Sequence, residues 1–361
     1  MTSARITEPG PAAAAGSSRE APLVSIVVVN YNGADSLEAC LEALALHAGD
    51  GNEVLVVDNA STDGSAEIAD RFAAEVPAIR VLRSPVNRGY AGGVNTGLAE
   101  ARGRHIAVLN MDIVVTPGWL DPLVESLRQR PATGAVCPLI VLRADPGTIN
   151  AAGQDLHVTG LGFNRWLGKP RERAGSEPIL VSGLHGGAFV IRREILDRLG
   201  GWDESGFLYA EDVQLSWQLQ LLGVDVLCVP ASVVSHDYHL SMHPRKLFLL
   251  ERNRAVAVFG DFGAGTLAAL APMHLVTELM MWGYCLLRGP RFLKAKLDTY
   301  RWLFANRGRV RARRALARSI RRRRDREILR RVRWGYAWDQ FLTLGRERGL
   351  AQRRQIPEQA G

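Results

Sequence analysis

The chain has 361 residues, of which 47% are hydrophobic and 23% are charged. This composition is that of a globular protein with a full core, in one large or two medium domains. The cysteines lie far apart and form no CxxC pair, which argues against a zinc knuckle or a disulfide framework and fits a reducing cytosol. The formal charge of +8 belongs to the C-terminal part, because arginines crowd residues 288–333.

Residues 1–22 are rich in Ala, Gly, Ser and Pro and lack the apolar h-region of a signal peptide. We expect a disordered leader there, and nothing in it predicts secretion.

Strands and helices alternate in the first third of the chain. The β-branched run VSIVVV at 24–29 predicts a buried strand, and the apolar periodicity from Asp35 to Leu46 predicts a helix. The pattern continues with strands expected at 53–58, 79–84 and 105–112, and with helices expected at about 65–74 and 91–101. This alternation predicts a parallel sheet with helices on its faces.

Polar residues lie at the end of every predicted strand. They are Asn30, Tyr31 and Asn32, then Asp58 and Asn59, then Asn87 and Arg88, and finally Asn110 and Asp112. Ligands of parallel sheets bind beyond the carboxyl ends of the strands, so these residues predict a binding rim. A lone carboxylate inside a buried strand would be costly, so Asp112 is expected at the strand end, facing a partner. Taken singly, Asn32 and Asn59 are equally well explained as turn formers.

Two other binding motifs fit poorly. DNASTDG resembles part of a calcium loop, but Ala60 and Thr62 stand where an EF-hand needs oxygen-rich side chains, and no Glu occupies the twelfth position. NRGYAGGVNTG is glycine-rich before a helix, but it lacks the G-x-G-x-x-G spacing and follows the third strand. A Rossmann dehydrogenase is therefore not expected.

The motifs SIVVVNYNG, VLVVDNASTDGS, NRGYAGGVNTGL and LNMD, in this order and spacing, resemble the nucleotide-sugar-binding half of family 2 glycosyltransferases. The segment from His185 to Pro230 is similar to their acceptor half, and the rhamnosyltransferase-like branch is the closest. The resemblance covers roughly residues 23–260. It implies the α/β GT-A fold, a mixed, mainly parallel sheet flanked by helices, here followed by a C-terminal α-helical segment.

The resemblance also implies a nucleotide-diphosphate sugar donor, UDP- or dTDP-linked. The donor-binding residues that it indicates are Asn30, Tyr31, Asn32, Asp58, Asn59, Arg88 and Asn110. Asp58 would accept a hydrogen bond from N3–H of a uracil or thymine ring. Arg88 would contact phosphate, although an ordinary exposed arginine is an equally good interpretation.

A divalent metal, Mg²⁺ or Mn²⁺, is the implied cofactor. The D-x-D motif of the family reads Asn110-Met111-Asp112 here, so Asp112 is the one acidic ligand that the resemblance carries over. A late histidine, His236, would complete the metal shell. A loop histidine held by a neighbour explains His236 equally well, and His239 and His243 lie close by in the sequence.

The acidic pair Glu211-Asp212 precedes a helix-like apolar run, a position where the helix dipole favours anions. Helix capping alone explains one of the two acids. The resemblance implies that Asp212 is the general base, with Glu211 as the fallback. Acceptor contacts are expected from Gly186, Gly187, Trp202 and Asp203.

The C-terminal third differs in character. Residues 263–287 are long and apolar enough to span a bilayer, but they contain Pro272, His274 and Glu278, which favours a helix lying in the interface or packed on the preceding domain. The following arginines alternate with Phe, Leu and Trp, which predicts basic amphipathic helices on an anionic membrane surface. Nucleic-acid binding is the weaker interpretation, because no recognition fold accompanies the charge.

We therefore expect a leader (1–22), a GT-A catalytic domain (23–260, with halves 23–115 and 116–260), a membrane-contacting segment (261–345) and a tail (346–361). The expected activity is inverting transfer of rhamnose or another hexose to a hydroxyl of a lipid-linked or polysaccharide acceptor, in cell-envelope glycan synthesis. The expected location is cytoplasmic, peripheral on the inner face of the cell membrane. The alternative is a non-catalytic sugar-nucleotide or polyanion-binding protein with the same fold.

Overall fold

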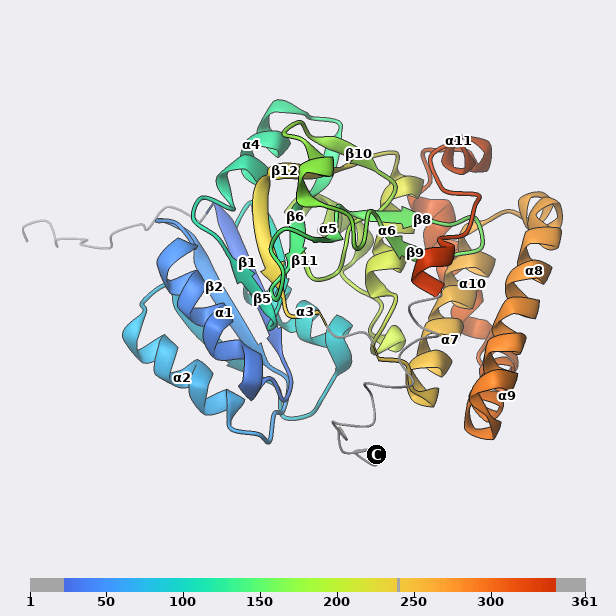
Figure 1. Cartoon of the computed structure of the whole chain (residues 1–361), viewed down its shortest axis with the longest axis horizontal. Coiled ribbons are helices and arrows are strands. Elements are labelled where there is room, and N and C mark those ends of the chain that lie inside the picture. Colours follow the sequence, from blue (N-terminus) through green and yellow to red (C-terminus); the bar gives the residue numbers. More distant parts are fainter. Residues whose placement is uncertain (1–22, 239–240, 342–361) are drawn as a thin grey trace, which may run out of the picture.

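The computed structural model describes residues 23–238 and 241–341 (Figure 1). The expected leader, the expected tail and His239 lie outside these residues. A ten-stranded sheet forms the centre of the molecule, with the order β10-β12-β6-β11-β4-β1-β2-β3, while β5 pairs with β12 and β7 with β6.

The four strands expected from the β-branched runs form the parallel half of this sheet. They are β1 (Val24–Asn30), β2 (Glu53–Asp58), β3 (Ile79–Arg83) and β4 (His105–Asn110). The expected helices between them are α1 (Ala34–His47), α2 (Ser65–Glu75) and α3 (Gly89–Glu100). β4 ends at Asn110, earlier than expected, and Met111 and Asp112 form a turn. Asp112 thus lies beyond the strand, where its charge avoids full burial.

The other half of the sheet is mixed. β11 runs antiparallel to β4 and β6, whereas β12 runs parallel to β6 over most of its length. β12 extends as far as His236. The strands here are β5 (Ile113–Val115), β6 (Thr133–Leu142), β7 (Ile149–Ala151), β10 (Ile179–Val181), β11 (Ala188–Arg192) and β12 (Asp225–His236); a separate pair is β8 (Gln154–Leu156) and β9 (Gly162–Asn164).

Helices cover both faces of the sheet because its buried strands are apolar on both sides. Val24, Ile26 and Val28 of β1 join the core cluster of α1, α2 and α4 (Asp121–Gln129). Val27 and Val29 join the cluster of α3, α5 (Arg193–Leu199) and α6 (Glu211–Leu222). Two short 3₁₀ helices, η1 (Arg171–Ala174) and η2 (Glu204–Gly206), lie in connections.

Among the described residues, five helices follow the sheet and lie at the end of the molecule away from α1 and α2 (Figure 1). They are α7 (Pro244–Asp261), α8 (Ala264–Arg288), α9 (Pro290–Ala305), α10 (Arg307–Ile320) and α11 (Asp325–Leu329). α7 packs against α6 and also against α9 and α10, so it joins the two parts.

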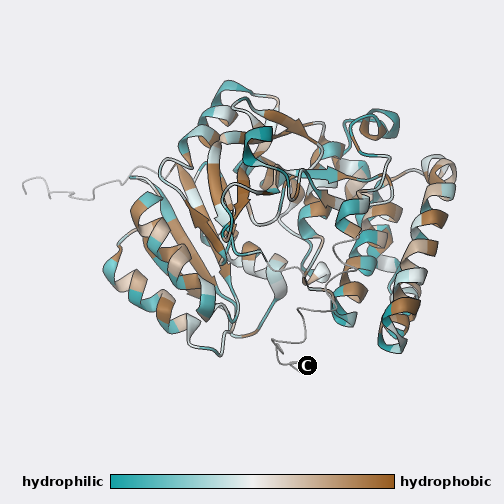
Figure 2. Cartoon of the chain, viewed as in Figure 1, coloured by the Kyte–Doolittle hydropathy of each residue, from teal (hydrophilic) through white to brown (hydrophobic). Residues whose placement is uncertain are grey.

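Helix α8 is amphipathic. Within the described ranges it is the one helix long and apolar enough to cross a membrane by length and composition, which is weak evidence of a span. Leu275, Leu279 and Leu286 are 61%, 63% and 64% exposed, and Figure 2 shows hydrophobic residues along this helix. Glu278 turns inward, where Arg254 Nη2 and Lys296 Nζ lie 3.0 and 2.8 Å from its carboxylate.

Several arginines of the basic segment bind the rest of the protein instead of facing solvent. The buried guanidinium of Arg313 pairs with Asp261, with Nε 2.7 Å from Oδ1. Arg323 Nη2 donates to the carbonyl of Gly223 at 2.8 Å and to Asp225 at 3.0 Å. The sequence pattern predicted that the arginines of this segment face a membrane. Some of them instead form ion pairs and hydrogen bonds that hold α10 and the residues after it against the preceding part of the chain.

Candidate functional site

The first part of the site lies where β1 and β2 end side by side. Asn30 and Asp58 are paired in register, and Asn30 Nδ2 donates to Asp58 Oδ1 at 3.1 Å and to Ser65 Oγ at 2.9 Å. Asn30 is fully buried, and Arg83 Nη1 lies 3.7 Å from Asp58 Oδ2. The structure therefore brings these two predicted donor residues together, with Asn30 joining the strand ends to the start of α2.

Two further predicted donor residues hold the loops of this rim. Asn32 accepts the amide N–H of Thr62 at 2.8 Å through its side-chain oxygen. Asn59, which is buried, donates to the carbonyl of Gly89 at 2.9 Å and accepts the amide N–H of Arg88 at 3.0 Å. These contacts agree with the simpler interpretation of both asparagines as loop formers. Tyr31 follows β1 in the same bend and is partly exposed.

Arg88 is engaged by a carboxylate. Its Nη2 lies 2.8 Å from both oxygens of Glu204, and its Nη1 donates to Thr96 Oγ1 at 3.1 Å. The expected phosphate contact would have to replace the Glu204 pair.

The second part of the site is the pair Asp112 and His236. β5 pairs antiparallel with the end of β12, with Ile113 opposite His236, and this register brings Asp112 Oδ2 to 3.3 Å from His236 Nε2. His236 Nδ1 lies 2.9 Å from Oδ1 of Asn150 on β7. The sequence predicted both metal-ligand candidates, and the structure places them in contact.

This pair fits a divalent ion. When Nδ1–H donates to Asn150, the Nε2 lone pair faces a carboxylate oxygen, and a divalent cation bound by both groups would satisfy these two acceptors. Asp112 Oδ1 is buried with no hydrogen-bond partner among the described residues, and Asn110 Oδ1 beside it is in the same state. In the described part of the chain no cluster of three or more His, Cys, Asp or Glu could hold a metal, so a bound ion would take further ligands from donor phosphate and water.

His185 borders this pair and was not singled out from the sequence. Its ring centroid lies 5.9 Å from that of His236, and its Nδ1 accepts the amide N–H of Gly187 at 3.0 Å. Burial, helped by the neighbouring His236, lowers the pKa of His185 to about 3. His185 is therefore neutral. It lies beside Asp112 and His236 without adding a positive charge that would repel a bound cation.

The third part is the acidic pair at the start of α6. Asp212 Oδ2 accepts from Gln154 Nε2 at 2.7 Å and from the amide of Gly186 at 3.0 Å, and burial raises the pKa of Asp212. Burial, and then the charge of Asp212, raise the pKa of Glu211 to about 8, and its Oε2 is buried without a partner among the residues described. At neutral pH Glu211 therefore keeps its proton, which favours Asp212 as the ionised member of the pair.

A strained loop sets the position of this pair. Phe207, Tyr209 and Ala210 have positive φ angles of 60°, 69° and 64°, which costs energy for residues other than glycine. Asn253 of α7 holds the loop, since its Nδ2 donates to the carbonyl of Gly206 at 3.0 Å and to that of Tyr209 at 2.7 Å. Such strain persists where surrounding contacts fix it, as these do.

Gly89 allows the start of α3 to touch the same loop. A Cβ at Gly89 would lie 2.0 Å from the carbonyl oxygen of Phe207, and the φ of Gly89 is +71°. The adjacent amide of Tyr90 donates to this oxygen at 2.8 Å. The glycine-rich motif that is unsuited to dinucleotide binding thus serves close packing against the loop before Glu211.

Tyr90 links the metal-ligand pair to the acidic pair. Its hydroxyl donates to the carbonyl of Gly186 at 3.1 Å. Burial raises the pKa of Tyr90 well above its ordinary value, and the charges of Glu211, Asp212 and Asp112 raise it further. The Tyr90 hydroxyl therefore lies beside the Gly186 turn, which also binds Asp212, and near enough to Glu211 and Asp112 to be affected by their charge.

The four predicted acceptor residues separate into two sets. Gly186 contacts Asp212 as above, and the carbonyl of Gly187 accepts the amide N–H of Asn110 at 2.9 Å, so both glycines lie within the site. Trp202 is a core residue whose backbone is held by Asn95, and Asp203 caps η2 by accepting from Ser205 N at 3.0 Å. In the ranges that the structure covers, neither of these two is hydrogen-bonded to Asp212 or Glu211.

The raised pKa of Glu211 predicts a pH-dependent gain in stability for Glu211→Gln. The ordinary pKa of 4.5 rises to about 8 in the folded chain, so folding is penalised as pH rises from 4.5 through 8 and the penalty is complete above that. Glutamine removes the penalty, so the free energy of unfolding of the variant should exceed that of the unmodified protein by at least about 1 kcal/mol at pH 9, with little gain at pH 4. Thermal unfolding at both pH values measures this. Glu42→Gln, at an exposed position of α1, is the control, and an equal gain at both pH values would contradict the assignment.

Residues 25–200 match the family model described as "Glycosyl transferase family 2". The N-acetylglucosaminyl-diphospho-decaprenol L-rhamnosyltransferase of Mycobacterium tuberculosis (strain CDC 1551 / Oshkosh) is 28% identical over 265 residues, 64% of this chain and 85% of that protein. The pre-mycofactocin glycosyltransferase of the same strain is 30% identical over 221 residues, 61% of this chain and 43% of that protein.

Among solved structures, the crystal structure of GalNAc-T7 with UDP, GalNAc and Mn²⁺ is similar, with a TM-score of 0.56 and 20% sequence identity. The match covers 68% of this chain and 49% of that one, so this chain spans about half the length of that structure. At this identity the likeness concerns the fold alone, and it confirms the expected mixed, mainly parallel sheet flanked by helices.

Proposed function

Because this chain belongs to glycosyl transferase family 2 through residues 25–200, and is therefore a glycosyltransferase that uses a nucleotide-sugar donor, we propose that it transfers a hexose or deoxyhexose, with inversion, to a hydroxyl of a lipid-linked or polysaccharide acceptor. The observation that carries this proposal is the arrangement of Asp112, His236 and Asp212 around Tyr90 and the Gly186-Gly187 turn. Rhamnose is the sugar we favour, and synthesis of a cell-envelope glycan is the pathway, because the similar mycobacterial protein is named as a rhamnosyltransferase acting on a diphospho-decaprenol.

In the proposed reaction the acceptor oxygen forms a bond to the anomeric carbon, the bond from that carbon to the diphosphate breaks, and Asp212 takes the acceptor proton. The hydrogen bonds from Gln154 and Gly186 orient Asp212, while protonated Glu211 adds no second negative charge beside it. A bound Mg²⁺ or Mn²⁺ supplies positive charge that stabilises the departing diphosphate. Asp112 and His236 would hold this ion, and Asn150 fixes the His236 ring.

On the donor side we propose direct contact by Tyr31, Asp58 and Asn110, with Asp58 accepting from the N3–H of a pyrimidine ring. Asn30, Asn32 and Asn59 already make the loop contacts described above, so their contribution is the shape of the rim. Arg88 reaches a phosphate only when its pair with Glu204 opens.

A panel of UDP-, dTDP- and GDP-linked sugars tests the donor assignment. A ligand that binds only the folded state raises the unfolding temperature. One nucleotide class, UDP or dTDP, should raise it in the presence of Mn²⁺ and lose most of this effect with a chelator. No stabilisation by any member of the panel would contradict the proposed site.

We also propose that residues 23–260 form the catalytic domain and that 261–345 attaches it peripherally to the inner face of the cell membrane. The exposed leucines of α8 support attachment. Glu278 pairs with Arg254 and Lys296 on the side of α8 that faces the protein. This pairing favours a helix that lies on the membrane and not one that spans it.

Leu279→Glu should therefore weaken binding to vesicles that contain anionic lipid, by about tenfold, because it places a carboxylate on the apolar face. Vesicle co-sedimentation measures this at low salt. Leu46→Glu is the control, since Leu46 is 77% exposed on α1, outside the proposed membrane-contacting segment. Equal binding by the two variants would contradict attachment through α8.

A further inference from the structure

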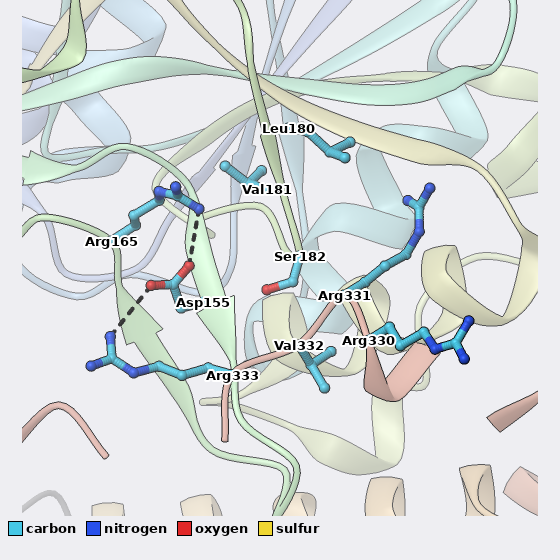
Figure 3. A pocket seen from close by; sticks show the side chains of 9 residues that line it. All are labelled: Asp155, Arg165, Leu180, Val181, Ser182, Arg330, Arg331, Val332 and Arg333. Atoms are coloured by element: carbon cyan, nitrogen blue, oxygen red, sulfur yellow. Dashed lines mark hydrogen bonds and ion pairs between the residues drawn. The ribbon is translucent and has the colours of Figure 1, made fainter. Parts of the chain in front are cut away.

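A cavity rich in arginine lies between β8, β10 and the chain that follows α11. Its volume is about 540 Å³. Figure 3 shows the side chains of Arg165, Arg330, Arg331 and Arg333 around it, with Asp155 between two of them. Val181 and Val332 contribute apolar surface to the same cavity.

The positive charge of this arginine cavity exceeds the negative charge that balances it. Asp155 is shared, with Arg165 Nη1 at 3.3 Å and Arg333 Nη1 at 3.4 Å (Figure 3). Arg331 pairs with Asp225 at 2.8 Å, and Asp225 also pairs with Arg323.

Two of the arginines that line the cavity have donor groups without a partner among the described residues. Arg330 forms no ion pair or side-chain hydrogen bond with any described residue, and Arg165 Nε is buried without an acceptor among them. A buried donor such as Arg165 Nε is costly while it lacks an acceptor, and the exposed guanidinium of Arg330 can take up an incoming anion without breaking an ion pair.

The cavity is fixed in place by the backbone. The amide of Arg333 donates to the carbonyl of Leu156 at 2.7 Å, and the amide of Val158 donates to the carbonyl of Arg333 at 3.0 Å. Three of the four arginines are therefore carried by a segment that pairs with the end of β8, so their side chains begin from an ordered backbone.

β8 separates this cavity from the acidic pair. Gln154 reaches Asp212, whereas its neighbour Asp155 faces the arginines, since adjacent side chains of a strand point to opposite faces. None of the arginines that line the cavity belongs to the proposed donor site or metal-ligand pair. The cavity is therefore distinct from the transfer site, although β8 contributes Asp155 to the cavity and Gln154 to the contact with Asp212.

We propose that the arginine cavity binds a phosphate or diphosphate group. Guanidinium groups bind phosphate oxygens through paired, charge-assisted hydrogen bonds, and four of them around one space match an anion with several oxygens. Leu180, which is 49% exposed at the cavity, and Val181 give an apolar border beside the anion. The phosphate comes either from a soluble ligand or from a lipid headgroup.

Titration calorimetry of the full-length protein with inorganic pyrophosphate, in chelator and without nucleotide sugar, tests this proposal. The variant Arg330→Gln/Arg331→Gln should bind pyrophosphate at least tenfold more weakly than the unmodified protein. The matched control is Arg326→Gln, an exposed arginine of α11 outside the cavity, which should change the affinity less than twofold. Arg330→Gln alone, at an exposed position, should give a smaller loss in the same direction and does not disturb the Asp225 pair.

Absence of pyrophosphate binding, or equal affinities for the cavity variant and the control, would overturn the proposal. Vesicles of phosphatidylcholine with phosphatidic acid distinguish the two sources. A loss of vesicle affinity in the cavity variant alone assigns the site to a lipid phosphate, whereas a loss confined to pyrophosphate assigns it to a soluble one. Neither measurement requires a donor sugar or turnover, so the result is independent of the proposed transferase reaction.

Discussion

Asp212→Asn should lower the turnover number by about 10²- to 10⁴-fold, the range typical for loss of a general base, while donor affinity stays nearly unchanged. Asparagine keeps the size of the side chain and can still accept from Gly186 and Gln154, but it cannot take a proton. The loss should therefore appear in turnover and not in binding.

Steady-state kinetics together with donor titration separate these two quantities. Asp197→Asn, at an exposed position of α5, makes the same chemical change away from the site and should leave both unchanged. Turnover by Asp212→Asn within threefold of the unmodified protein would exclude Asp212 as the base. In that case Glu211→Gln should show the loss, since Glu211 is the other carboxylate at the start of α6.

Asp112→Ala should abolish the Mn²⁺ dependence of donor binding and lower turnover roughly 10³-fold, because charge on the leaving diphosphate would lose its stabilisation. The variant leaves His236 and Asn150 in place, so the loss would result from removal of the Asp112 carboxylate. Donor titration at increasing Mn²⁺ concentration measures it.

His236→Ala provides the matched test of the pair. Two ligands of one ion act as a unit, so the double variant should lose little more than Asp112→Ala alone. Additive losses, or an unchanged Mn²⁺ dependence in Asp112→Ala, would show that the contact between Asp112 and His236 is a simple ion pair.

The parallel half of the sheet and its rim could be predicted from the sequence because local signals agree there. β-branched runs, helix periodicity and polar residues at each strand end lie within short stretches of the chain. The cost of burying a charge predicted that Asp112 lies at the end of its strand and not inside it. The turn that follows β4 agrees with this prediction.

The residues that complete the site were not predictable in the same way. Gln154 and Asp212 are 58 positions apart, and His236 and Asn150 are 86 apart. Their contacts depend on the pairing of β6 with both β7 and β12 and on the placement of β8, which no local pattern encodes. Tyr90 lies in a quoted motif, but its role depends on the distant turn at Gly186.

The arginine-rich segment after residue 288 shows a second limit of prediction from the sequence. Alternation of arginine with apolar residues indicates amphipathic helices, but it does not distinguish an arginine that faces solvent from one that binds a carboxylate elsewhere in the chain. Arg313 with Asp261 and Arg323 with Asp225 are of the second kind, and partners of that kind are identified only by the folded chain.

Release of nucleoside diphosphate is the most direct test of the central claim, that Asp112 and His236 on one side and Asp212 on the other form one transferase site. The unmodified protein, mixed with the donor selected from the panel, Mn²⁺ and a lipid-linked acceptor, should release nucleoside diphosphate and glycosylated acceptor in equal amounts. Release should stop with a chelator and nearly stop in Asp212→Asn, although that variant still binds the donor. Donor binding by the unmodified protein without any such release, or unchanged release by Asp212→Asn, would contradict the account.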